Sequence, residues 1–276
     1  MRRVLWVTDP HLDFLPPFGA RAFGRALGNE NPKAEGLILT GDVGRYDNLR
    51  WALTELAEGF NRPVWFVLGN HDAYGGSIRE AETVAREVTL RSEGRISWLP
   101  VVEPIELAPD TMLVGVDGWW DASAGDPYSS RFLMNDWVQI GEFQGFMLPR
   151  IIEVAQGIGA AMAKRTTKVL QAALARKPRT VIYACHVPPF PGASWHEGGI
   201  SGNDTLPWYS NLQAGKALLR IGEANPDVNF LVLCGHTHSP GRYSALPNML
   251  VLTGRSDYGN PQISAILDPG AITLGA

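Results

Sequence analysis

The chain has 276 residues, of which 45% are hydrophobic and 19% charged, and its formal net charge is −4. Such a chain is long enough for one large α/β domain whose core needs no disulfide support. Acidic and basic residues are mixed along the sequence, which argues against a broad nucleic-acid-binding surface. No run reaches about 18 apolar residues, so we expect no membrane span and a cytoplasmic protein.

The first third of the sequence alternates between apolar strands and amphipathic helices. Residues 3–8, 36–40 and 63–68 are short apolar runs, as expected for buried strands. In residues 47–60 and 77–91 apolar side chains recur every three or four positions, which predicts helices with one buried face. Alternation at this spacing predicts an α/β fold with parallel or mixed strand pairing.

The pattern changes after residue 95. Residues 96–119 contain several short apolar runs in succession, which predict consecutive strands. Residues 118–148 are rich in Gly, Asp and aromatic residues without periodicity, and we expect a variable insertion there on the substrate side of the fold. Pro149 suits the first turn of a long helix, which we expect to run to about residue 176.

The last third returns to strand–helix alternation and ends in strands. Residues 180–186 and 229–234 predict two more buried strands, with a helix at about 212–224 between them. The tail, residues 241–267, predicts antiparallel strands. Because no repeat, low-complexity segment or linker interrupts the sequence, we expect residues 1–276 to form one domain.

Polar residues with metal-binding chemistry follow five of the predicted strands. They are Asp9 and His11, Asp42, Asn70 and His71, His186, and His236 and His238. Five of the six histidines in the chain lie at these strand ends. The carboxyl ends of strands in an open α/β sheet are where binding sites form, so we expect these side chains to converge.

The residue types predict a dinuclear site for divalent ions. Imidazole and carboxylate ligands without thiolate favour Mn, Fe, Zn, Co or Ni. Asp42 stands alone between ligand residues on either side, and one carboxylate oxygen in each coordination shell would let it bridge two ions. The glycines that precede Asp42, Asn70 and His236 allow close backbone approach.

The order of these blocks resembles that of the calcineurin-like metallophosphoesterases. The motifs D-x-H, GD, GNHD, a single His and GHTH follow one another from residue 9 to residue 238, which is most of the chain. The resemblance implies an α/β fold of four layers, an α-β-β-α sandwich in which two mixed β-sheets are flanked by helices. The change of pattern near residue 96 agrees with a second sheet.

The resemblance also implies roles for individual residues. One metal ion would be held by Asp9, His11, Asp42 and His238, and the other by Asp42, Asn70, His186 and His236. His71 would bind no metal, but would lie near the scissile phosphate and assist the leaving oxygen. The implied reaction is hydrolysis of a small phosphoester by a hydroxide that bridges the two ions, with Asp42 and His71 as catalytic residues.

Departures from known branches of the family narrow the choice of substrate. Protein Ser/Thr phosphatases have GD-x-x-D-R-G, whereas Arg45 replaces the second Asp here, so His71 lacks that partner. Asp72 could orient His71 instead, or could stand at a helix N-terminus. Purple acid phosphatases have Tyr three residues after the bridging Asp, whereas Tyr46 comes four residues after Asp42. The GNHD form and the compact size look closer to bacterial phosphodiesterases, including cyclic-nucleotide enzymes.

Two other functions stay open at this point. The first is a phosphomonoesterase or protein phosphatase that uses the same metal chemistry. The second is a non-enzymatic protein-binding scaffold on the same fold, such as the small subunit of retromer, which has lost the His corresponding to His71. The presence of His71 together with every implied ligand favours an enzyme.

The loops 118–132 and 188–199 are the candidates for substrate recognition. They offer three tryptophans and the sixth histidine: Trp119, Trp120, Trp195 and His196. The tryptophans could stack on a base or pack in the core, and the histidine could contact substrate or solvent. The only cation in either loop is Arg131, which suits a diester better than a more highly charged monoester. Tyr258 is a further candidate to face the site.

Overall fold

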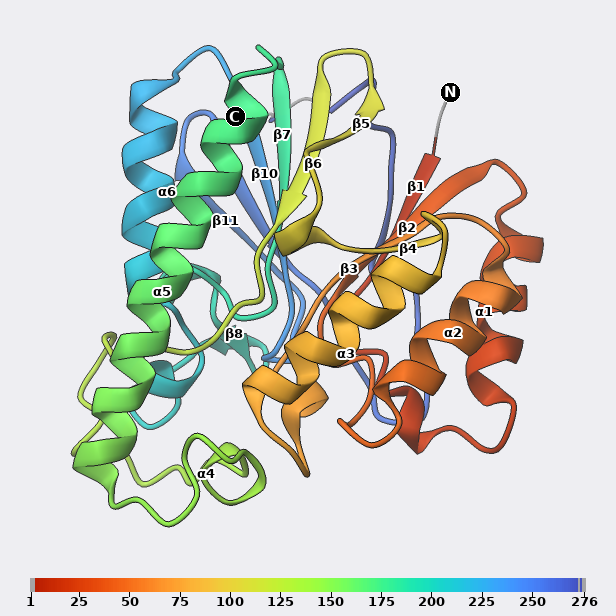
Figure 1. Cartoon of the computed structure of the whole chain (residues 1–276). Coiled ribbons are helices and arrows are strands. Elements are labelled where there is room, and N and C mark those ends of the chain that lie inside the picture. Colours follow the sequence, from red (N-terminus) through yellow and green to blue (C-terminus); the bar gives the residue numbers. More distant parts are fainter. Residues whose placement is uncertain (1–2, 273, 275–276) are drawn as a thin grey trace.

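The computed structural model describes residues 3–272 and residue 274, and it contains two β-sheets with helices on their outer sides (Figure 1). The helices are α1 (Gly19–Glu30), α2 (Leu49–Phe60), α3 (Ile78–Arg91), α4 (Asp136–Gln139), α5 (Leu148–Leu174) and α6 (Leu212–Ala224). Short 3-10 turns occur at Leu12–Phe14, His71–Ala73, Leu99–Val101, Pro191–Ala193 and Leu206–Trp208. Across the described residues, none of the helices has the length and apolar character needed to cross a membrane.

The first sheet combines the N-terminal part of the chain with one strand from the C-terminal part. Its order is β13-β1-β2-β3-β4, with β1 at Arg3–Val7, β2 at Ala34–Thr40, β3 at Val64–Val67, β4 at Ile96–Trp98 and β13 at Ala265–Leu267. β1 to β4 pair in parallel because α1, α2 and α3 carry the chain back between successive strands. β13 pairs antiparallel with β1. The three helices cover the outer face of this sheet (Figure 1).

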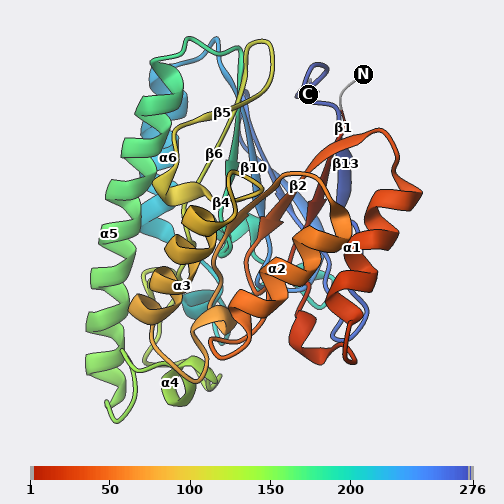
Figure 2. The same ribbon diagram turned by 45° about the vertical axis from the view of Figure 1, so that its right-hand side comes forward.

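The second sheet has the order β11-β12-β10-β7-β6-β5. Its strands are β5 (Ile105–Ala108), β6 (Thr111–Gly115), β7 (Thr180–Ala184), β10 (Asn229–Cys234), β11 (Gly241–Leu246) and β12 (Met249–Thr253). The four central strands are parallel and the two edge strands are antiparallel to their neighbours. α5 and α6 cover its outer face (Figure 2). A separate hairpin joins β8 (Trp195–His196) to β9 (Gly199–Ile200).

Side chains on each strand alternate between the space between the sheets and the helix-covered outer face. In β1, Val4 and Trp6 belong to a buried cluster shared with Leu231 of the second sheet. The intervening Leu5 and Val7 belong to the larger cluster that includes the helices. Burial on both faces explains why these strands appear in the sequence as continuous apolar runs. The predicted four-layer sandwich is confirmed.

Most predicted elements occur with boundaries shifted by one or two residues, and β11 and β12 of the tail pair antiparallel as expected. The sequence did not predict that β12 also pairs in parallel with β10. The turn at Pro247 and Asn248 reverses the chain after β11 and inserts β12 between β11 and β10. β13 then crosses to the first sheet. Strand pairing of this kind depends on contacts between distant segments, which periodicity does not reveal.

Asp117 links the two sheets at the end where the polar residues gather. It follows β6 of the second sheet, and its side chain is buried. Its Oδ1 atom accepts hydrogen bonds from the Leu68 amide (2.7 Å), just after β3, and from Nε1 of Trp98 (2.8 Å), the last residue of β4. One carboxylate oxygen therefore joins three strand ends, and Leu68 directly precedes the GNHD segment.

Replacing Asp117 with Asn should change how the stability of the metal-free protein depends on pH. Burial raises the pKa of Asp117 to about 7, whereas the unfolded carboxyl group titrates near 3.8. The contribution of the neutral acid to stability is therefore complete below about pH 4 and is lost as the pH rises toward 7. Asn cannot ionise, and its oxygen can accept both hydrogen bonds.

Between pH 4 and pH 8, Asp117→Asn should therefore gain up to about 4 kcal/mol in unfolding free energy relative to wild type, since one pKa unit corresponds to 1.36 kcal/mol. Urea denaturation in the presence of a chelator measures the difference. If the two proteins keep a constant difference in stability over this range, then Asp117 is already ionised in the folded protein.

Candidate metal centre

The polar residues predicted at the strand ends converge at one end of the two sheets. Asp9 and His11 follow β1, Asp42 follows β2, Asn70 and His71 follow β3, His186 follows β7, and His236 and His238 follow β10. The first three strands belong to one sheet and the last two to the other. The site therefore lies where the two sheets meet, and neither sheet alone carries the complete set.

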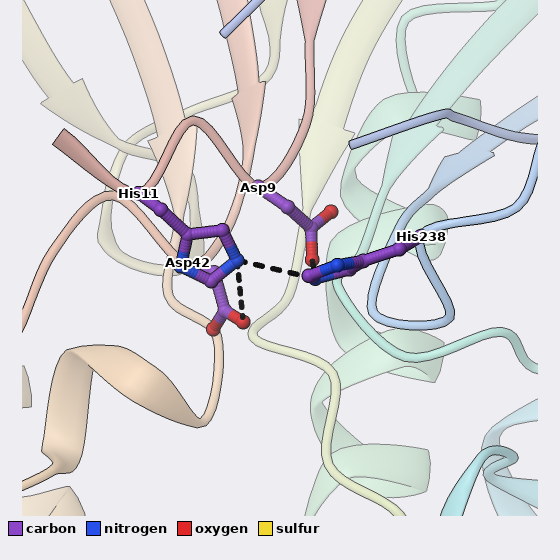
Figure 3. Close-up of side chains that lie close together, drawn as sticks. All are labelled: Asp9, His11, Asp42 and His238. Carbon is purple, nitrogen blue, oxygen red and sulfur yellow. Dashed lines mark hydrogen bonds and ion pairs between the residues drawn. The ribbon is translucent and has the colours of Figure 1, made fainter. Parts of the chain in front are cut away.

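Asp9, His11, Asp42 and His238 form the first group, and one ligand atom from each lies within 4.8 Å of the others (Figure 3). Nε2 of His11 is 3.1 Å from Nε2 of His238 and 3.9 Å from Oδ2 of Asp42. Nε2 of His238 is 3.4 Å from Oδ1 of Asp9. Two imidazoles and two carboxylates at these separations suit one divalent ion.

Asn70, His186 and His236 form the second group. Oδ1 of Asn70 lies 3.0 Å from Nε2 of His186 and 3.0 Å from Nδ1 of His236. Oδ1 of Asp42 lies 3.3 Å from Nε2 of His186. Asp42 thus turns one carboxylate oxygen toward each group, which is the geometry expected of a bridging ligand.

The other ring nitrogens of the second group show which tautomers are present. Nδ1 of His186 donates to the carbonyl of Thr40 (2.8 Å), and Nε2 of His236 donates to the carbonyl of Trp208 (2.9 Å). A neutral imidazole carries a single N–H, so the nitrogens that face Asn70 hold lone pairs. Three acceptor atoms therefore face one another with no proton to share. A divalent cation among them would be stabilised, so these residues fit a metal ion.

Burial keeps His11, His186 and His236 in the form that binds metal. It lowers the pKa of His11 and that of His236 to about 3, and it lowers the pKa of His186 as well. Because charged imidazolium is disfavoured away from water, the rings are neutral at physiological pH. Neutral imidazole nitrogen is the usual ligand for transition metals.

The two carboxylates experience opposite net effects from their surroundings. Burial, followed by proximity to Asp9 and Asp72, raises the pKa of Asp42 well above its usual value. Burial also opposes ionisation of Asp9, but the nearby His186 and His238 outweigh it and lower the pKa of Asp9. Two carboxylates in one buried site repel each other when both are charged, and a bound cation would relieve that repulsion.

Strained backbone accompanies the site. Five of its residues have positive φ values, 46° at Asp9, 42° at His11, 51° at Asp42, 70° at His236 and 57° at His238. This left-handed conformation is uncommon outside glycine and costs of order 1–3 kcal/mol per residue. Such strain is typical of functional sites, and here it turns the residues that follow three strands toward one point.

Two glycines permit the close approach of the loops, as the sequence predicts. A Cβ atom at Gly69 would stand 2.2 Å from Oδ1 of Asp42, and one at Gly235 would stand 1.9 Å from Oδ2 of Asp9. Both separations are far below van der Waals contact. Each glycine therefore leaves room for a carboxylate that follows another strand, Asp42 after β2 and Asp9 after β1.

His71 lies beside both groups. Its Nε2 atom is 3.9 Å from Oδ2 of Asp42, the oxygen that also approaches His11. Its ring stacks on that of Tyr74, with the centroids 4.2 Å apart and an angle of 25° between the planes. Burial lowers the pKa of His71 well below its usual value. Arg45, which stands where protein phosphatases have the second Asp, donates to Gln139 and lies 5.9 Å from the Tyr74 ring on which His71 stacks.

Asp72 organises the backbone of the site. Its Oδ1 atom accepts hydrogen bonds from the amides of Val43 (2.9 Å) and Gly44 (3.0 Å), and its Oδ2 atom accepts one from the amide of Gly69 (2.8 Å). The carboxylate thereby joins the loop after β2 to the loop after β3. Asp72 lies in the first turn of the 3-10 helix His71–Ala73, which agrees with the second role considered in the sequence, a helix N-terminus, and these three bonds go to backbone amides instead of the His71 ring.

A cavity of about 200 Å³ opens beside His71 and the second group. Its apolar and aromatic lining consists of Tyr74, Phe132, Leu133, Met134, Tyr209 and Tyr258. Among the lining residues that the structure describes, none is Lys or Arg. Tyr258 faces the site as expected, with its ring centroid 4.4 Å from that of His11. Phe132, Leu133 and Met134 belong to the insertion, but their only sequence signal was their position in that irregular segment.

The structure corrects the expected substrate contacts. Trp119 and Trp120 are only 2% and 1% exposed, and Trp120 packs between Phe143 and Trp208, so neither offers a face for stacking. Both tryptophans belong to the larger buried cluster of the core. Trp195 covers Gly241 at the start of β11, outside the cavity.

The sixth histidine, His196, also lies outside the cavity lining. Its ring contacts Tyr209 at 5.1 Å between centroids, and Tyr209 in turn contacts His236 at 5.2 Å. Tyr209 therefore separates His196 from the second group. The aromatic residue that reaches the site from this side is Tyr209, which lies ten residues beyond the loop considered in the sequence.

Comparisons with known proteins agree with this geometry. The model of the calcineurin-like phosphoesterase family matches residues 2–240. A phosphopantetheinyl hydrolase from Mycobacterium tuberculosis has a similar structure, with a TM-score of 0.61 at 16% identity over 94% of this chain and 90% of that one. A dimetal phosphatase from Danio rerio superposes with a TM-score of 0.55 at 16% identity over 94% and 88% of the two chains. No curated protein sequence gives a significant match.

Proposed function

Since the chain belongs to the calcineurin-like phosphoesterases, which use two divalent metal ions, we propose that it hydrolyses a phosphodiester bearing a flat or apolar group. That it is a metal-dependent phosphoesterase follows from the family. The proposal concerns the role of each residue and the class of ester. One observation carries the choice of ester, namely a cavity in which aromatic and apolar side chains lie opposite the candidate metal ligands, without Lys or Arg among its described lining residues.

The two groups of side chains are assigned to the two ions. The first ion would be held by Asp9, His11, Asp42 and His238, and the second by Asp42, Asn70, His186 and His236. The assignment is supported by the two oxygens of Asp42, one 3.9 Å from His11 and the other 3.3 Å from His186. Manganese is the ion we propose to supply first, because Mn accepts both carboxylate oxygen and imidazole nitrogen.

Bound divalent ions supply positive charge to the phosphoryl oxygens and activate water near neutral pH. The side chains of the protein would orient the ester and stabilise the leaving group. His71 borders the cavity and is neutral, so its ring N–H can donate to the leaving oxygen as negative charge develops there. Stacking on Tyr74 holds the ring in place, so little reorientation is needed during the reaction.

The lining of the cavity favours a diester over a monoester. A monoester carries one more negative charge near neutral pH, and sites that prefer it usually add fixed cations beyond the metal ions. The insertion instead presents Phe132, Leu133 and Met134, and Tyr209 and Tyr258 complete the wall. These side chains would remove an apolar or planar ester group from water at about 25 cal/mol per Å² of buried apolar surface.

A panel of esters tests the proposal. With Mn²⁺ supplied, kcat/KM should be higher for bis-p-nitrophenyl phosphate than for p-nitrophenyl phosphate, and cyclic nucleotides identify whether a base occupies the cavity. Faster turnover of the monoester would refute the diesterase proposal while leaving the metal assignment intact.

A cation placed at the cavity rim should shift this preference. Leu133 is 78% exposed while lining the cavity, so Leu133→Lys adds a charge without disturbing the core. We expect the monoester to gain about two- to fivefold in kcat/KM relative to the diester, the range of an exposed ionic contact. Leu133→Gln controls for shape, and Val138→Lys, an exposed residue outside the cavity lining, controls for net charge.

A further inference from the structure

The segment of residues 118–148 contributes a buried carboxylate, that of Asp136, which contacts Asn70. Asp136, the first residue of α4, has no solvent exposure. Its Oδ1 atom accepts hydrogen bonds from Nδ2 of Asn70 (2.9 Å) and from the hydroxyl of Tyr74 (2.6 Å). Its Oδ2 atom accepts one from Nε1 of Trp120 (2.7 Å). These three donors satisfy the carboxylate of Asp136, whose burial without hydrogen-bond partners would be costly.

The amide of Asn70 therefore has a donor end and an acceptor end with different neighbours. Nδ2 is directed at Asp136 and lies 3.2 Å from the hydroxyl of Tyr74. Oδ1 is directed at the lone pairs of His186 and His236, each 3.0 Å away. Only the oxygen end of an amide is a metal ligand, so the direction of this side chain decides whether Asn70 can serve the second group.

The histidines by themselves do not select that direction. In the opposite orientation, Nδ2 of Asn70 could donate to the same lone pairs of His186 or His236, which would satisfy the amide without a metal ion. The oxygen would then face Oδ1 of Asp136, which already accepts from the Tyr74 hydroxyl, and the two oxygens would repel each other. Asp136 is therefore the neighbour that excludes the unproductive orientation.

The same carboxylate acts on His71 through Tyr74. The Tyr74 hydroxyl that donates to Asp136 anchors the ring on which His71 stacks, at 4.2 Å between centroids. One oxygen of Asp136 thus holds both a residue of the second group and the support of His71. Because Asp136 lies on α4, the irregular segment of residues 118–148 contacts the candidate metal centre directly.

We propose that Asp136 is a positioning residue, which fixes the amide of Asn70 with its oxygen toward the second metal ion and, through Tyr74, orients His71. The inference rests on the proposed assignment of Asn70 as a metal ligand, and it is independent of which ester the enzyme hydrolyses. Partners that orient metal ligands in this way typically contribute about 10–100-fold to metal affinity.

The test is Mn²⁺ binding to Asp136→Asn, measured by titration calorimetry and by the spin coupling of paired Mn²⁺ ions in electron paramagnetic resonance. Asn has the same shape but can donate toward Asn70 and so permits the unproductive orientation. We expect one ion to bind as in wild type, the second to bind about 10–100-fold more weakly, and the coupled signal to be lost at low metal concentration.

A reciprocal exchange separates positioning from simple structural support. In Asp136→Asn combined with Asn70→Asp, the new amide can donate to the new carboxylate, whose other oxygen then faces the histidines. The Tyr74 hydroxyl can accept from that amide. The exchange should restore binding of the second ion and the coupled signal. Asn70→Asp alone places two carboxylates in contact, so it should not give wild-type binding of the second ion.

Trp120→Phe is the matched control. It removes the donor to the other oxygen of Asp136 and costs stability, but it leaves the bonds to Asn70 and Tyr74. It should bind both ions with wild-type affinity. Retention of both ions at full affinity in Asp136→Asn would overturn the inference, as would failure of the exchange to restore the second ion. A wild-type protein that binds two ions yet hydrolyses no diester would overturn only the proposed substrate, whereas one that binds a single ion would overturn the assignment of Asn70 as a ligand and, with it, this inference.

Discussion

Asp42→Asn should lose tight binding of both metal ions and with it nearly all phosphoesterase activity. The two carboxylate oxygens of Asp42 face different groups, 3.9 Å from His11 and 3.3 Å from His186. The amide of Asn keeps one weaker oxygen ligand and turns a donor toward the other ion. We expect the affinity at each site to fall by more than the roughly 10–100-fold that loss of an outer partner costs.

The loss should not come from unfolding. Because burial and the neighbouring Asp9 and Asp72 raise the pKa of Asp42, a neutral side chain at this position should leave the metal-free protein at least as stable as wild type near pH 8. Asn also tolerates the positive φ value of 51° and can still accept the hydrogen bond from the His71 amide. Thermal unfolding with a chelator present measures this.

His11→Ala and Asn70→Ala are the matched controls, since each removes a ligand from one group only. Metal titration should then show one site weakened in each control and both weakened in Asp42→Asn. If Asp42→Asn binds one ion with wild-type affinity, Asp42 does not bridge, and the assignment of the two groups is wrong.

His71→Ala should keep both metal ions and lose about 10²–10⁴-fold in kcat. The ring lies at the edge of the cavity, and its Nε2 atom is 3.9 Å from Asp42, so it can reach a leaving oxygen without occupying a metal position. The deficit should shrink for esters of p-nitrophenol, whose acidic leaving group needs little help. A series of aryl diesters with leaving groups of rising pKa measures this dependence.

His71→Asn gives a control that can donate a hydrogen bond but cannot transfer a proton at neutral pH. If it recovers most of the activity with poor leaving groups, stabilisation of charge suffices and proton transfer is unnecessary. Loss of bound metal in His71→Ala would contradict the proposed role, because it would make His71 a ligand.

The tertiary structure also reassigned the residues around the site. Trp119 and Trp120 were reasonable substrate contacts by composition, yet both are buried in the core. The cavity wall is instead built from Phe132, Leu133 and Met134 of the insertion and from Tyr209. An aromatic residue in an irregular segment has the same sequence signature whether it points inward or outward, because no periodicity marks its buried face.

The convergence of the candidate metal ligands, in contrast, was predicted from the sequence. Each lies immediately after an apolar strand, and parallel strands bring their carboxyl ends to one edge, so local pattern and chain order together predict the convergence of Asp9, Asp42 and His186. The convergence depends on period, strand direction and residue type, all of which are properties of short segments. The two sheets with flanking helices were expected from the family resemblance, with which the change of pattern near residue 96 agrees.

What only the tertiary structure decided depends on contacts between segments far apart in the chain. The parallel pairing of β12 with β10, the link from Asp117 to Leu68, and the bond from Asp136 to Asn70 join residues separated by 19, 49 and 66 positions. A buried Asp in a loop carries no local mark of its partner, because the partner is chosen by burial and by the need to satisfy each buried polar group. The sequence by itself therefore determined the residue types of the candidate ligands and their order along the chain. Tertiary packing decided which side chains hold each candidate ligand in place and which side chains line the cavity.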